Sequence, residues 1–225
     1  MKLSKRLFSF LSSAREAAGF TMIELLIVIS ILGILAVAVL SAINPVEQIN
    51  RGRDTGSRSD AEQLLSAMDR FNAFQGYYPW TTNPNDPYAL DDGAGSLLVV
   101  DDTWTVEGAA AAANDCEVLL RLGEGDDTAA DSCTGSLELK RSFTQRITDA
   151  GYNSLYVYNE GTQGDSTYVC FTPQSGAFVQ EAETRCQDAA GTGLPADLQA
   201  MAGTICGGHS LDGTDDPTAM MICLP

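Results

Sequence analysis

The chain has 225 residues, of which 44% are hydrophobic, and a formal net charge of −17 from 30 acidic and 13 basic side chains. Residues 1–19 carry a surplus of +3, which leaves −20 for the rest of the chain. Because neutralising phosphates requires lysine and arginine, this charge excludes a protein specialised for nucleic acid, and we expect no direct nucleic-acid partner.

Residues 1–19 are predicted to be a short basic leader. Its charged residues are Lys2, Lys5, Arg6, Arg15 and Glu16. An ordinary secretory signal has its long apolar stretch before the cleavage site, whereas here that stretch begins after Gly19. Basic residues before a first apolar segment stay in the cytoplasm, so we expect the N-terminus inside the cell and the C-terminal part exported.

Residues 20–43 are predicted to be a membrane-spanning helix. From Gly19 the sequence reads GFTMIELLIVISILGILAVAVLSAI, with 19 consecutive uncharged residues starting at Leu25. As a helix this run is about 28 Å long, close to the roughly 30 Å hydrocarbon core of a bilayer. Glu24 is the exception, because a charged side chain in lipid is costly and usually paired. Cleavage after Gly19 would create an amino group at Phe20 able to pair with Glu24 of a neighbouring copy, which indicates assembly as well as anchoring.

Residues 44–76 are predicted to continue as an amphipathic helix. Apolar residues recur at helical spacing and indicate a stripe packed on the domain that follows: Ala61, Leu64, Leu65, Met68 and Phe71. Most polar residues of this stretch lie off that face: Asp60, Glu62, Gln63, Asp69 and Arg70. We expect the helix to end at Gly76 and to bend or melt locally at Pro45, Gly52 and Gly56.

Residues 77–225 are predicted to form an exported α+β head. Its predicted strands are residues 96–100 and 155–158, a hairpin of 168–171 with 177–180, and an edge strand near 220–223. Its predicted helices are residues 109–113 with 118–122, and residues 137–148. Alternation of these elements favours one small domain with its own core.

All six cysteines lie in the predicted head, and their number is even. In an oxidising compartment this indicates up to three disulfides, for which sequence alone allows 15 connectivities. The spacing favours Cys116–Cys133 and Cys206–Cys223 as local loops, which leaves Cys170–Cys186. Because the chain lacks a CxxC pair and has a single histidine, His209, a zinc site is a poor interpretation.

The N-terminal sequence resembles the type IV pilin superfamily, which includes pilins, minor pilins and type II secretion pseudopilins. The matching features are Gly19, Phe20, Thr21, Glu24, the apolar run and Gly33, and then Arg53-Asp54 to Leu65 and Gly76-Tyr77-Tyr78-Pro79. The resemblance covers about residues 1–80. It implies a long N-terminal helix packed on a small antiparallel sheet, with loops tied by disulfides.

The resemblance also implies a route of assembly. A prepilin peptidase cuts between Gly19 and Phe20 and methylates the new Phe20 amine. Glu24, with Thr21 beside it, then serves assembly by neutralising the Phe20 amine of an adjacent subunit. A platform protein and an assembly ATPase draw copies from the lipid of the cytoplasmic membrane into an extracellular helical filament. The helix loosens near Gly33 and Pro45.

Three alternatives to a pilus subunit stay open. A secretion pseudopilin would hold Ca²⁺ on an acidic loop, with Asp212, Asp215 and Asp216 as ligands and residues 86–92 as a weaker candidate. A minor pilin would act as an adhesin through loops of the head. A signal-anchored enzyme would have to use His209, which stands in a glycine-rich stretch. For a pilus subunit we expect no catalytic residues and no cofactor.

Overall fold

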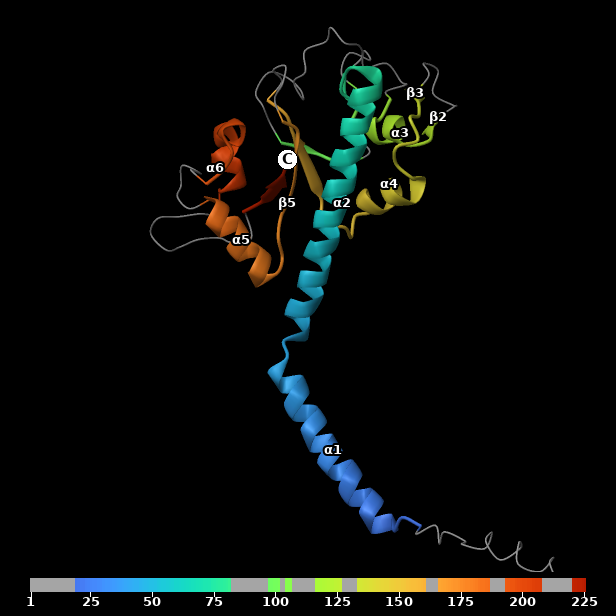
Figure 1. Ribbon diagram of the computed structural model, residues 1–225, viewed down its shortest axis with the longest axis vertical. Coiled ribbons are helices and arrows are strands. Elements are labelled where there is room, and N and C mark those ends of the chain that lie inside the picture. The colour runs from blue at the N-terminus through green and yellow to red at the C-terminus, as the bar shows by residue number, and fades with distance from the viewer. Residues whose placement is uncertain are drawn as a thin grey trace, which may run out of the picture. The chain divides into compact units, whose positions relative to one another are not determined.

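The computed structural model describes residues 19–81, 97–101, 104–106, 116–126, 133–160, 166–186, 193–207 and 220–225, without the side chains of 125–126 and 133–134 (Figure 1). The chain divides into two compact units, Met1–Pro45 and Val46–Pro225.

The described part of the first unit is helix α1 (Met22–Ala42), which contains no buried residue. Among the described residues, α1 is the one helix long and apolar enough to cross a membrane. Ser30 satisfies its hydroxyl within the helix by donating to the Leu26 carbonyl (2.7 Å). The helix is continuous through Gly33, which was expected to be a break, and gives way to extended backbone at Ile43. A residue before proline disfavours helical backbone, which explains a stop ahead of Asn44-Pro45.

Helix α2 (Pro45–Gln75) opens the second unit, and its proline has the fixed φ that suits a first helical position. The helix runs without interruption through Gly52 and Gly56, so neither is the break that was expected. Gly76 ends it at a φ of 80°, as predicted, because glycine adopts this left-handed conformation without strain. The predicted stripe is confirmed at Ala61, Leu64, Met68 and Phe71, each at most 3% exposed. The predicted Leu65 is only partly buried, and Ala67, which was not predicted, is fully buried.

The stripe of α2 packs on an antiparallel sheet in the order β1 (Leu98–Val99), β4 (Leu155–Tyr158), β5 (Tyr168–Phe171), β6 (Ile222–Leu224). Aromatic and β-branched residues are frequent in β4 and β5. Four of their buried side chains share one core with α2: Leu155, Val157, Val169 and Phe171. This arrangement confirms an α+β head with a small antiparallel sheet.

Shorter elements cover the head beside α2: α3 (Val118–Leu122), β2 (Gly125–Asp126), β3 (Cys133–Thr134) and α4 (Arg141–Ile147) (Figure 1). The predicted helix at 137–148 is confirmed in α4, which buries Phe143 and Ile147. It begins later than predicted because Leu137 has a φ of 60° and Lys140 is extended.

Helix α5 (Gly176–Cys186) corrects the prediction that residues 177–180 form the second strand of a hairpin. The segment has a helical start because carboxylates of α2 accept the N–H groups of Gln174 and Ser175, just before the helix, and of Gly176, its first residue. The chain continues through the 3-10 helix η1 (Ala196–Met201) and α6 (Ala202–Ile205). These elements form a second buried cluster with Tyr158 and Tyr168 of the sheet.

Two predicted disulfides are wrong. The structure pairs Cys170 with Cys223 and Cys186 with Cys206, in place of Cys170–Cys186 and Cys206–Cys223. The reason is topological: β6 returns beside β5 in a register that puts Cys170 opposite Cys223, with Cα atoms 4.0 Å apart. Cys116 is also disulfide-bonded, and the side chain of its predicted partner Cys133 lies outside the described residues.

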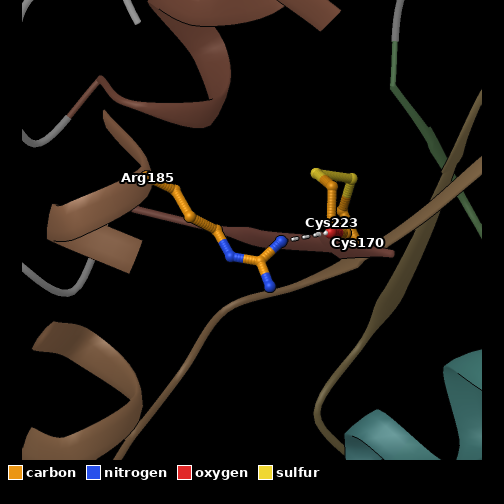
Figure 2. Close-up of a disulfide and its surroundings, with 3 residues drawn as sticks. All are labelled: Cys170, Arg185 and Cys223. Carbon is orange, nitrogen blue, oxygen red and sulfur yellow. Dashed lines mark hydrogen bonds between the residues drawn. A yellow bond between two sulfur atoms is a disulfide. The ribbon is translucent and has the colours of Figure 1, made fainter. Parts of the chain in front are cut away.

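The outer side of β6 contacts the helices that precede it in the chain. Arg185 of α5 donates from Nη1 to the Cys223 carbonyl (3.0 Å), next to the disulfide (Figure 2). The Met221 amide donates to the Ile205 carbonyl at the end of α6 (2.9 Å).

Candidate functional site

The predicted scissile bond, Gly19–Phe20, lies just before α1. Both residues are exposed, and the Phe20 side chain is 78% exposed. Thr21 is extended and caps α1. A bond in this position is accessible and free of helical hydrogen bonds, as a peptidase substrate has to be.

Thr21 and Glu24 form a capping box at the start of α1. Glu24 accepts at Oε2 from the Thr21 amide (2.8 Å) and hydroxyl (2.7 Å), and the Glu24 amide donates to Thr21 Oγ1 (3.3 Å). Within the described residues, Oε1 of Glu24 makes no hydrogen bond. The carboxylate therefore satisfies the helix terminus with one oxygen, and the other has no partner among the described residues.

The surface of α1 is apolar on every side. Its large apolar side chains are 47% to 90% exposed. Monomeric soluble proteins rarely expose a contiguous apolar surface of this extent, which points to lipid or other protein as its surroundings. Apart from Glu24, α1 contains no charged residue.

The N-terminal half of α2 carries polar residues to which the sequence analysis assigned no role. Asp54 is fully buried and accepts from the amides of Gln174 (2.9 Å) and Ser175 (2.7 Å) and from the Ser175 hydroxyl (2.6 Å). Glu47 accepts from the Gly176 amide (3.2 Å). These acceptors satisfy the N–H groups that a helix start leaves unpaired, and so fix the origin of α5.

Asp60 was predicted to lie off the buried face, which is wrong: it is 4% exposed and holds two partners from the head. Arg146 donates to Oδ1 (2.6 Å) and the Tyr152 hydroxyl to Oδ2 (2.5 Å). Burial and this hydrogen bond raise the pKa of Tyr152 well above its usual value. Asp60 therefore ties α2 to α4 and to the loop before β4.

A third contact joins α2 to α5 through Glu181, which pairs with Arg58 of α2 and with Arg185 (2.7 Å). Burial alone would raise the pKa of Glu181, but hydrogen bonds and charge from the two arginines lower it below its usual value. Arg58 also lies over the ring of Phe178, 5.2 Å from its centre.

The sequence held a signal for these contacts. Counting back from Ala61 by alternating steps of four and three residues gives Ser57, Asp54, Asn50 and Glu47, the same helical period as the apolar stripe. The face of α2 that packs on the head thus continues N-terminal to residue 61, with polar side chains in place of apolar ones. A search for apolar residues alone does not find it.

Other predicted site residues fall outside the described residues: His209 and the candidate calcium ligands Asp212, Asp215 and Asp216. Among the side chains that the structure describes, three or more histidine, cysteine or acidic residues nowhere gather closely enough to hold a metal ion.

Residues 15–40 match the family model described as the prokaryotic N-terminal methylation motif. The match spans the end of the leader, the Gly19–Phe20 bond, the capping box and most of α1. Comparison with curated proteins and with solved structures finds no match for this chain.

Proposed function

Because this chain carries the N-terminal methylation motif of type IV pilin-like precursors, we propose that it is a structural subunit of a type IV pilus-like extracellular filament. The match at residues 15–40 carries the proposal. The open oxygen of Glu24 and the fully exposed apolar surface of α1 support it. The role is structural and requires no catalytic residue.

The first step is processing at the membrane. The precursor spans the cytoplasmic membrane through α1, with its leader inside the cell. A prepilin peptidase cuts the Gly19–Phe20 bond and methylates the new amine. Methylation preserves the positive charge of an amine, so Phe20 is still able to pair with a carboxylate.

The second step is assembly. The Phe20 amine of one copy approaches Glu24 of the next at the oxygen that the capping box leaves open. In lipid a carboxylate without a cationic partner is unfavourable, so pairing favours the register in which each copy adds to the last. A platform protein and an assembly ATPase draw the copies out of the membrane, and α1 becomes the core of the filament.

A secretion pseudopilin is the second candidate, since the same motif begins both kinds of precursor. The acidic sequence around Asp212, Asp215 and Asp216 favours it, because hard oxygen ligands suit Ca²⁺. The length of the chain favours the pilus. Sheared surface filaments distinguish the two: a pilus subunit is recovered in quantity, whereas a processed chain missing from that fraction assigns the pseudopilin.

The experiment that tests the proposal is mass spectrometry of the N-terminal peptide of protein isolated from its own cells. We expect a peptide that begins at methylated Phe20. Replacing Gly19 with leucine provides the control, because a bulky residue at the cut should leave the leader attached. An intact leader in the parent chain, or a cut elsewhere, would overturn the proposal.

A further inference from the structure

Leu137 combines two unfavourable properties. Its φ of 60° lies in the left-handed region, which is strained for a bulky side chain. Its side chain is also 73% exposed. The backbone of this turn is held against the end of α3, where the Ser136 amide donates to the Arg121 carbonyl (2.8 Å) and the Leu137 amide to the Gly123 carbonyl (2.9 Å). Glycine or asparagine would fit such a turn better, so the described contacts give no reason for leucine.

A second exposed apolar residue belongs to the same region. Phe74, in the last turn of α2, is 80% exposed. Arg70, one turn earlier on the same face, binds Glu138 through Nε and Oε2 (2.6 Å) and also reaches the Glu138 carbonyl (3.5 Å). This ion pair holds the turn with Phe74 next to the segment with Leu137.

Two basic residues follow Leu137 closely in the chain. Lys140 and Arg141 are exposed at the start of α4, and neither forms an ion pair with the described carboxylates. After the leader the chain has 29 acidic side chains against nine basic ones. In so acidic a chain, two neighbouring cations that form no ion pair with the described carboxylates are unusual. We name Phe74, Leu137, Lys140 and Arg141 the Leu137 patch.

We propose that the Leu137 patch is an interface that docks on an acidic surface of a second copy of this chain. The partner is chosen by charge complementarity, because every copy has a strong excess of carboxylates, and the two cations of the patch pair with none of the carboxylates that the structure describes. The exposed leucine and phenylalanine supply the apolar area that such a contact buries. The inference rests on the proposed filament, in which α1 brings the heads of successive copies together.

The test compares variants of the full chain in its own cells, measured as the share of subunit in sheared filaments. L137N removes the apolar side chain but suits a φ of 60°, and K140Q/R141Q removes two positive charges. The control Q180E/T184E makes the same change of net charge on exposed positions of α5. We expect the filament share to fall at least about fivefold in L137N and in K140Q/R141Q, and to stay at the parent level in the control.

Two further measurements keep the outcomes distinct. All variants should show methylated Phe20, and the head of L137N should resist protease at least as well as the parent. A photo-crosslinking phenylalanine analogue at position 74 should link two copies of the chain in filaments. Parent-level assembly of L137N and K140Q/R141Q, or crosslinks to lipid or to another protein alone, would overturn the inference and leave the proposed function standing. A parent chain without methylated Phe20 and without filaments would overturn both.

Discussion

Glu24 serves its own helix and, in the proposed filament, a neighbour. Replacement by alanine removes both the cap and the charge, whereas glutamine keeps the hydrogen bonds of a capping box and removes only the charge. We predict that E24Q and E24A are both cut and inserted into the membrane, and that both assemble to about a tenth of the parent level or less. Quantifying filaments against methylated precursor checks this, and an E24Q chain that assembles like the parent would assign the role of Glu24 to the cap.

Asp54 accepts the hydrogen bonds of the polar groups that precede α5. D54A would leave two backbone N–H groups and a hydroxyl without their acceptor, and a buried donor without a partner costs about 1–3 kcal/mol. We predict a loss of at least about 3 kcal/mol in the free energy of unfolding of the head. N50A, which removes a single more exposed hydrogen bond to the Gln174 carbonyl, is the control and should cost less than about 1 kcal/mol.

Denaturant titration of the full chain in detergent measures this difference. The chain has two tryptophans, Trp80 and Trp104, and both are buried in the head, so their fluorescence reports the head and not α1. Equal midpoints for D54A and N50A would show that Asp54 does not stabilise α5.

At the scale of elements, one described disulfide joins β5 to β6, and the other joins the end of α5 to the end of α6. Peptide mapping without reduction should recover Cys170 linked to Cys223, and Cys186 linked to Cys206. The double variant C186S/C206S should lose about 3 kcal/mol of head stability, because it frees a loop with a sequence separation of 20. A peptide that joins Cys206 to Cys223 would restore the original prediction and contradict this arrangement.

The features that could be predicted from the sequence were those determined by residues close together in the chain. The determinants of the capping box and of the Gly19–Phe20 bond lie within six residues, so the candidate site was found by its pattern. The end of α2 at Gly76 was predicted for the same reason. Helix α5 was misassigned as a strand, because its first turn depends on Asp54, which is 120 residues away from Gln174. The disulfides were mispaired because their partners follow from the pairing of β6 with β5, which spacing does not encode.

For the molecule as a whole, the head should lose stability in alkali. Burial and the hydrogen bond to Asp197 raise the pKa of Tyr168 to about 12, and Tyr152 is shifted in the same direction. An unfolded tyrosine releases its proton near pH 10, before the folded one does, so the stabilisation is complete below pH 10 and is lost as the pH rises towards 12. Y168F should reduce the slope of unfolding free energy against pH between 10 and 12. An unchanged slope would mean that Tyr168 contributes nothing to it.

The proposed filament would bring many heads close together, and β6 forms one edge of the sheet in each head. The outermost strand of a sheet offers unpaired backbone groups, and these can recruit a strand from another chain and seed aggregation. At β6 the Cys223 carbonyl accepts from Arg185 of the same head (Figure 2). The Met221 amide donates to the Ile205 carbonyl, also within the head. In the proposed filament, these contacts within one head would keep the Cys223 carbonyl and the Met221 amide from pairing with a strand of a neighbouring copy, so contact at this edge is left to side chains.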